Sequence, residues 1–309
     1  MKQLKKLASV FFLGFLFISL AACSLEGPGQ GGTNSGSGSD SDSLTIGLSV
    51  STLNNPFFVA LRDGVIAEAE ANGINVEIVD AQDDAAKQVN DVEDLLTAGV
   101  DILIINPTDS AAIATAVESA NAQGVPVITL DRSSDGGDVV TFIASDNVAG
   151  GEQAAQFIID QLGENATVVE LQGIPGASAT RERGQGFNNL AASLNIVASQ
   201  SANFDRGEGL NVMENILQAQ PDVAAVFAHN DEMALGALEA INASGRDIMV
   251  IGFDGNDDAL ASISNGGMAA TVAQQPDVMG QLAVQTALQI HNGETPQAQI
   301  SAPLRLVTE

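Results

Sequence analysis

The chain has 309 residues, 45% of them hydrophobic, and contains 31 glycines. This length can bury a sizeable core and corresponds to about two domains of 100–200 residues each. With 39 acidic against 11 basic residues, the formal charge at pH 7 is −28. That balance excludes a nucleic-acid-binding protein, because phosphate backbones are held by patches of lysine and arginine.

The first 22 residues have the layout of a secretory signal peptide, with three lysines followed by an apolar run over residues 7–22,. Leu20-Ala21-Ala22-Cys23 also resembles a bacterial lipobox, in which the cysteine becomes the lipidated first residue of the mature protein. We therefore predict removal of residues 1–22 and lipidation of Cys23; the alternative is an ordinary signal peptide with an incidental cysteine. Because Cys23 is the only cysteine, no disulfide can form within the chain.

Residues 23–43 are rich in glycine, serine, asparagine and aspartate, which predicts a flexible tether,. No later apolar run is long enough to cross a bilayer,. We therefore expect an exported protein, in the periplasm or at the cell surface, that is held to a membrane by lipid alone.

From residue 44 onward, short apolar runs alternate with amphipathic stretches. This βαβ alternation predicts parallel sheets with helices on both faces. In the first half, strands are expected at 45–50, 74–79, 102–105, 125–130 and 139–144, with helices near 57–72, 84–98 and 109–123,.

A second series of the same kind follows. Its strands are expected at 167–171, 196–199, 223–228, 248–253 and 269–273, with helices near 147–162, 179–193, 206–219, 231–244 and 256–265,. A helix near 277–291 and a strand within 304–307 close the chain. The predicted fold class is α/β, with two doubly wound, Rossmann-like domains.

The turn after the first strand has the form of a helix start, with Asn55 as N-cap and Pro56 at the first helical position,. Phe57 and Phe58 follow. Because neighbours on a helix point about 100° apart, they cannot share one core-facing stripe. We expect one of the two rings to face a cleft, since ligands of open parallel sheets bind outside the carboxyl ends of the strands.

Polar residues follow many of the other strands: Asn106, Asp131, Arg132, Asn230, Asp254 and Gln274. Each alone is an ordinary turn former or N-cap. Together they would converge on two facing rims, one per domain. Amides, carboxylates, an arginine and flat aromatic rings suit a sugar, whose hydroxyls both donate and accept while its C–H faces stack on rings.

Several longer motifs carry a family resemblance. They include Ser51 to Phe58, Ile105-Asn106-Pro107-Thr108-Asp109-Ser110, Val127 to Arg132, Ile143 to Val148, Arg181-Glu182-Arg183-Gly184, Asn230 to Leu238 and Gly252-Phe253-Asp254-Gly255. On these motifs the chain resembles the periplasmic ribose-binding proteins of bacterial ABC importers from about residue 44 to 307. The absence of tryptophan separates it from the related glucose- and galactose-binding proteins.

The resemblance implies a set of pocket residues with particular roles. Phe57, Phe58 and Phe204 would pack on the sugar, and the remaining members would hydrogen-bond its hydroxyls: Asn55, Asn106, Asp131, Arg132, Arg183, Asn230, Asp254 and Gln274. It implies no catalytic residue, no metal and no cofactor.

The resemblance also implies a domain plan with three crossovers, near 145–146, 274–276 and 302–304. One sugar-binding lobe would comprise 44–145 and 276–302, and the other 146–275 and 303–309. A sugar would stabilise the closed form of the protein, which is expected to be a monomer. The closed form would then be presented to an ABC-type permease, with a chemotaxis receptor as a second candidate partner. D-ribose is the expected ligand; allose, another close sugar or a sugar-derived signal are the alternatives.

An exported sugar hydrolase is the rival from another functional class, with Asp131 and Asp254 as its two carboxylates. We expect Arg132 and Arg183 to hold both carboxylates ionised and therefore unsuited to acid catalysis. His229 and His291 lack metal-ligand spacing and a nucleophile partner,.

Overall fold

The computed structural model describes residues 43–308 of the protein. The expected signal peptide and Cys23 lie outside the described residues, as does the tether apart from Ser43. Across residues 43–308, no helix combines the length and the apolar character needed to span a membrane.

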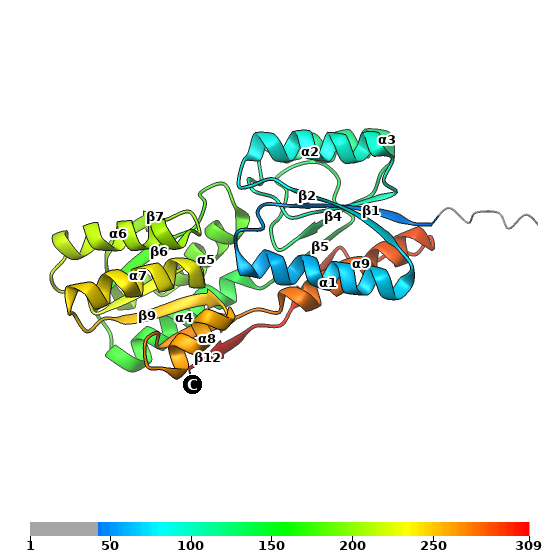
Figure 1. Ribbon diagram of the computed structural model, residues 1–309. Helices are drawn as coiled ribbons and strands as arrows, with labels where there is room; N and C mark the ends of the chain where they lie inside the picture. Colours follow the sequence, from blue (N-terminus) through cyan, green and yellow to red (C-terminus); the bar gives the residue numbers. More distant parts are fainter. Residues whose placement is uncertain (1–42, 309) are drawn as a thin grey trace, which may run out of the picture. The chain divides into compact units, whose positions relative to one another are not determined.

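Two six-stranded sheets form the framework (Figure 1). The first sheet is entirely parallel, in the order β11-β5-β4-β3-β1-β2. We call it, with its four helices, lobe 1. Its elements are β1 (Thr45–Val50), α1 (Pro56–Asn72), β2 (Asn75–Asp80), α2 (Ala85–Ala98), β3 (Ile102–Ile105), α3 (Ala114–Gln123), β4 (Val127–Leu130), β5 (Thr141–Ser145), α9 (Pro276–His291) and β11 (Gln299–Ala302).

The second sheet has the order β12-β10-β9-β8-β6-β7 and is parallel except for β12. With its helices it forms lobe 2. Its elements are α4 (Asn147–Leu162), β6 (Ala166–Gln172), α5 (Ser178–Asn189), a 3₁₀ turn (Ala191–Ser193), β7 (Leu194–Ser201), α6 (Arg206–Ala219), β8 (Ala225–Ala228), α7 (Asp231–Ser244), β9 (Met249–Asp254), α8 (Asp257–Ser264), β10 (Ala270–Ala273) and β12 (Arg305–Val307). The predicted fold class, two doubly wound α/β sheets, is confirmed.

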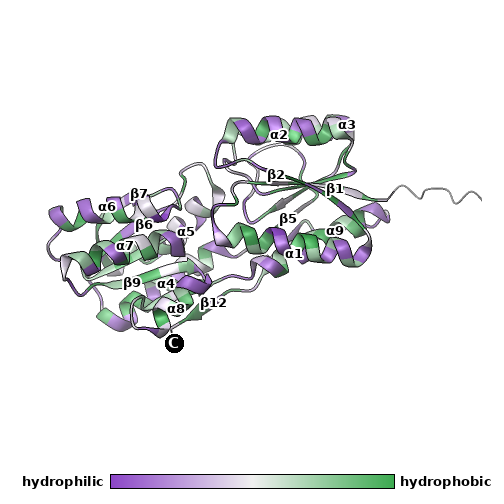
Figure 2. Cartoon of the chain, in the orientation of Figure 1, coloured by the Kyte–Doolittle hydropathy of each residue, from purple (hydrophilic) through white to green (hydrophobic). Residues whose placement is uncertain are grey.

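Helices cover both faces of each sheet, as parallel strands require. In lobe 1, α1 and α9 pack on one face, while α2 and α3 pack on the other. In lobe 2, α6, α7 and α8 share one core with the sheet, and α4 and α5 share another. The helices alternate between hydrophobic and hydrophilic residues along their length (Figure 2), the pattern of elements buried on one side,.

The chain passes between the lobes three times: from β5 to α4, from β10 to α9 and from β11 to β12. The second passage returns α9 to lobe 1, where it packs on α1 through two glycines. A Cβ at Gly64 would collide with the carbonyl of Asp277, and one at Gly280 with the carbonyl of Leu61. These glycines allow the two helix backbones to approach closely.

Three local features differ from the sequence-based expectation. Strand β11 was not predicted, because its four residues, Gln299–Ala302, carry little apolar pattern and only Ala302 is buried. Helix α3 begins at Ala114 instead of near 109, since residues 110–113 form turns. The last strand, β12, runs antiparallel to β10.

Candidate functional site

A small cavity lies between the lobes, at the carboxyl ends of the strands. The space between its walls is about 220 Å³, part of which is open to solvent. Nine of the eleven residues expected in the pocket line it, together with Ala179. Lobe 1 supplies Asn55, Phe57, Phe58, Asp131 and Arg132, and lobe 2 supplies Arg183, Phe204, Asn230 and Asp254.

The β1–α1 turn provides the first wall of the cavity. Asn55 is the N-cap of α1, and its Oδ1 accepts from the backbone N–H of Phe57 at 2.9 Å. That bond occupies the amide oxygen and leaves the Nδ2 hydrogens to donate. Phe57 and Phe58 are both buried, meet edge to face at 5.2 Å and both line the cavity. The helix-start pattern alone placed one of the two rings at a cleft, and the family resemblance placed both; in the structure the first helical turn presents both.

Asp131 and Arg132 follow β4 directly. Asp131 has a left-handed backbone (φ 65°), which turns the chain sharply at the strand end,. The Arg132 Nε lies 3.6 Å from an Asp131 carboxylate oxygen, and both side chains are almost fully buried. The Arg132 guanidinium also lies over the ring of Phe58, 5.0 Å from its centroid,.

Arg183, on α5, is held from several sides. Its Nε donates to Asn147 Oδ1 at 2.9 Å, and its Nη1 donates to the carbonyl of His229 at 2.6 Å. Its guanidinium stacks over Phe253 at 3.8 Å and lies 3.6 Å from Asp254 Oδ1. The planar group is thus fixed before any ligand arrives.

Phe204 and Asn230 complete the wall in lobe 2. Asn230 is the N-cap of α7 and accepts from the Met233 N–H at 3.0 Å, while its Nδ2 donates to the Phe204 carbonyl at 3.1 Å. Asn230 therefore holds Phe204, whose backbone is left-handed (φ 61°), at the cavity.

Two expected pocket residues do not line the cavity. Asn106 accepts from the Ser51 N–H at 3.1 Å and donates to the Leu130 carbonyl at 3.0 Å, so it joins the ends of β1 and β4. Gln274 donates to Asp254 Oδ1 at 2.9 Å. Each supports a residue that does line the cavity: Asn106 lies behind Asp131, and Gln274 lies beside Asp254.

Three buried polar atoms of this group have no hydrogen-bond partner among the described residues. They are Asp131 Oδ1, Arg132 Nε and Gln274 Oε1. An unmatched buried polar atom costs about 1–3 kcal/mol, so natural proteins rarely keep several together. Asp131 and Arg132 line the aromatic-walled cavity, whereas Gln274 lies beside Asp254. One unmatched acceptor and one unmatched donor at the cavity favour a ligand that both donates and accepts.

The carboxyl groups of Asp131 and Asp254 differ from expectation in their electrostatics. Burial raises the pKa of Asp131, although the nearby Arg183 and Arg132 oppose that rise. Burial also raises the pKa of Asp254 well above its usual range, opposed by Arg183 and reinforced by Asp231. We had expected the arginines to hold both carboxylates ionised. Instead, the arginines do not compensate fully for the hydration that the carboxylates lose on burial. No group of three or more His, Cys, Asp or Glu side chains within residues 43–308 is arranged to hold a metal ion.

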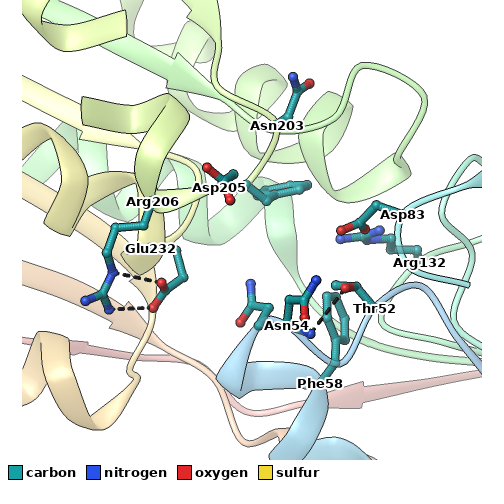
Figure 3. A pocket seen from close by; sticks show the side chains of 11 residues that line it. Thr52, Asn54, Phe58, Asp83, Arg132, Asn203, Asp205, Arg206 and Glu232 are labelled. Atoms are coloured by element: carbon teal, nitrogen blue, oxygen red, sulfur yellow. Dashed lines mark hydrogen bonds and ion pairs between the residues drawn. The ribbon is translucent and has the colours of Figure 1, made fainter. Parts of the chain in front are cut away.

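A wider outer pocket of about 490 Å³ adjoins the cavity and shares four residues with it (Figure 3). Thr52, Asn54, Asp83 and Arg132 lie on the lobe 1 side, and Asn203, Asp205, Arg206 and Glu232 on the lobe 2 side. Arg206 and Glu232 form a bidentate ion pair at 2.9 Å. The outer pocket is thus polar and carries charges of both signs.

The lobes also touch directly beside the cavity. The Ser133 N–H donates to Ser178 Oγ at 2.9 Å, and the Ser178 N–H donates to Ser110 Oγ at 3.2 Å. Arg181 and Asp135 form an ion pair at 2.7 Å. All three contacts join loops of lobe 1 to the start of α5 in lobe 2.

Sequence reasoning missed Asn147, Ala179 and most of the outer pocket. Asn147 comes two residues after the end of β5, much as Asn106 comes directly after β3, so the strand-end pattern could have found it. The sequence did not indicate Ala179 as a pocket residue, because a small apolar residue in a helix is usually part of the core.

Comparisons with known proteins agree with this geometry. A family described as periplasmic binding protein domain matches residues 46–295. The chain is 62% identical over 307 residues to the ribose import binding protein RbsB of Bacillus subtilis (strain 168), covering 99% of this chain and 100% of that protein. It is 34% identical to the D-allose-binding periplasmic protein of Escherichia coli (strain K12), covering 75% and 79%.

A solved structure is similar over the same region. The Caulobacter myo-inositol binding protein bound to myo-inositol is 37% identical, with a TM-score of 0.82, covering 86% of this chain and 93% of that one. Two lobes, a polar cavity between them, and matches that span nearly the whole chain lead to one conclusion: the chain belongs to the periplasmic binding protein family.

Proposed function

We propose that this protein captures a monosaccharide, D-ribose, in the cavity between its lobes and delivers it to the permease of an ABC importer. The observation that carries the proposal is the convergence of unpaired buried polar atoms at a cavity walled by Phe57, Phe58 and Phe204. A sugar offers hydroxyls to the unpaired polar atoms and C–H faces to the aromatic rings. The 62% identity to a ribose import binding protein supports ribose in particular.

The donor and acceptor pattern supports a neutral polyol. The amide oxygens of Asn55 and Asn230 are taken by backbone N–H groups, so these side chains offer donors. Asp131 and Asp254 offer acceptors, and Arg132 and Arg183 offer forked donors. A sugar with a misplaced hydroxyl would leave one of these groups unmatched, at a cost of about 1–3 kcal/mol.

Mechanistically, each lobe holds half of the site. A sugar that bonds both halves has higher affinity for the closed arrangement, so it shifts the population toward that form. The three crossovers would absorb the rotation as a hinge. We further propose export by cleavage of residues 1–22, anchoring through lipidated Cys23, function as a monomer without enzymatic activity, and presentation of the closed form to the permease.

Calorimetry with a panel of monosaccharides tests the proposal. D-ribose should bind with a Kd at or below about 1 μM, or about −8 kcal/mol, and D-allose, myo-inositol and L-arabinose should bind more weakly. A clear response to another sugar with none to ribose would change the ligand and keep the binding class. Turnover of a ribose glycoside by the purified protein would favour the hydrolase instead.

A further inference from the structure

Asp231 is a fully buried carboxylate that lies next to the cavity without lining it. It is the first residue of α7 and follows Asn230. Its Oδ2 accepts from the backbone N–H groups of Gly255 and Asn256, at 2.7 and 2.8 Å. Its Oδ1 accepts from the Thr271 hydroxyl at 2.7 Å. One side chain thus joins the start of α7 to the β9–α8 turn and to β10.

The β9–α8 turn is the segment that aims Asp254 at the cavity. Asp254 has φ 124° and Gly255 has φ 81°. A non-glycine residue at such a φ persists only where its surroundings determine it strongly. The two N–H groups that Asp231 binds belong to the next two residues, so Asp231 fixes the turn immediately after Asp254.

Strand β9 packs closely against the side chain of Asp231. A Cβ at Gly252 would collide with Asp231 Oδ1. Strand β9 therefore leaves room for this side chain at the point where it delivers Asp254, two residues later.

No basic residue within 43–308 forms an ion pair with Asp231. Three nearby elements carry charged or titratable groups. On its own helix, Glu232 pairs with Arg206, and on β9, Asp254 faces Arg183. At the start of α8 lie Asp257 and Asp258, and Asp258 also pairs with Arg206. Burial raises the pKa of Asp231 to about 7, its hydrogen bonds lower it, and Glu232 raises it. Asp231 in turn raises the pKa of Asp254.

We propose that Asp231 is a positioning residue for ligand binding: it holds the turn that aims Asp254 at the sugar, and its charge sets the acid limit of sugar affinity. The inference rests on the proposed function, since Asp254 is its route to the ligand. Ionised Asp254 accepts sugar hydroxyls, so binding favours its ionised form and releases protons. A charge on Asp231 opposes that ionisation.

Two substitutions separate geometry from charge. Asp231→Asn keeps an oxygen for the two N–H groups and an NH₂ group that can donate to Thr271, but removes the charge. Asp231→Ala removes all three bonds. Asp257→Asn is the matched control, because Asp257 is an exposed carboxylate at the start of α8, directly after the turn that Asp231 bonds. Thr271→Val, which removes one bond, replaces Asp231→Ala if that variant does not fold.

The readout is calorimetry with D-ribose from pH 5 to pH 8.5, in buffers of different ionisation enthalpy. At pH 7.5, Asp231→Ala should weaken affinity by about tenfold or more, because two buried N–H groups lose their acceptor and the turn relaxes. Asp231→Asn should bind within about threefold of wild type, hold its affinity to lower pH and release fewer protons near pH 7. Asp257→Asn should follow wild type throughout.

Two results would overturn the inference: wild-type affinity in Asp231→Ala (or in Thr271→Val, where it is used instead), or an Asp231→Asn pH profile that superimposes on wild type. Sugar binding by the wild-type protein tests the proposed function separately. If wild type binds a different sugar, the same series is run with that sugar. If it binds none, the proposed function fails and this inference fails with it.

Discussion

Arg132 of lobe 1 lies over the ring of Phe204 of lobe 2, with its guanidinium carbon 5.1 Å from the ring centroid. The same guanidinium lies 5.0 Å from Phe58, so an arginine from one lobe is sandwiched between aromatic rings of both. This contact lies in the cavity wall and joins the two lobes, so it depends on how closely the lobes approach each other.

Replacing Phe204 by leucine should therefore weaken sugar affinity by about 1–2 kcal/mol, through loss of the ring face and the cation–π contact. Calorimetry measures the change. Phe157→Leu is the control, since Phe157 is partly buried against the core of lobe 2 and does not line the cavity. It should lower the melting temperature and leave affinity alone, and equal affinity losses in both variants would refute a specific role for Phe204.

Arg183 and Arg181 lie on the same helix and provide a second matched pair. Arg183 is buried and bonded to Asn147 and to the His229 carbonyl, whereas Arg181 is about half exposed and pairs only with exposed partners. Arg183→Ala should cost on the order of 2–4 kcal/mol of ribose affinity. Arg181→Ala should cost at most about 1 kcal/mol, as exposed ion pairs do. Ribose binding like wild type in Arg183→Ala would contradict our placement of the lobe 2 half of the site.

The pH dependence of Asp131 follows from the direction of its pKa shift. Burial raises this pKa, against the attraction of Arg183 and Arg132, so the folded protein holds the proton more tightly than the unfolded chain. The resulting stability penalty is absent in acid and appears as pH rises from the unfolded pKa, about 4, through the folded value. Without sugar, Asp131→Asn should melt higher than wild type at pH 7.5 and equally at pH 4.

The same substitution should weaken ribose binding, because an amide replaces a carboxylate acceptor. Exposed Asp138 offers the control substitution Asp138→Asn. If Asp131→Asn melts lower than wild type at pH 7.5, the arginines outweigh burial at this site.

Salt should stabilise the fold. With the proposed removal of residues 1–22, which contain three lysines and no acidic residue, eight basic and 39 acidic residues would remain, a formal charge of −31. Such a chain repels itself when compact. The Debye length falls from about 10 Å at 0.1 M salt to about 3 Å at 1 M, so the melting temperature should climb across that range of sodium chloride.

Ribose affinity should change little over the same range, since the ligand is neutral. A melting temperature that is flat or falls with sodium chloride would show that the acidic surface does not oppose folding.

The sequence predicted the strands and helices that bury regular apolar patterns, and it placed most pocket residues by their position after a strand. It could not predict β11, whose pairing with β5 is set by the rest of the sheet rather than by its own residues. It also misjudged the ionisation of Asp131 and Asp254, because whether burial outweighs a nearby arginine depends on the three-dimensional arrangement of both lobes.

The return of α9 and β11 to lobe 1 has a consequence for biosynthesis. Helix α1 lacks its packing partner until α9, which ends at His291, has been made, and the first sheet lacks its edge strand β11 until residue 302 has been made. Lobe 2 can assemble most of its sheet from one continuous stretch, β6 to β10, whereas lobe 1 must wait for the end of the chain. A chain still emerging from the ribosome would therefore keep its N-terminal half incompletely folded, a state compatible with threading through an export channel.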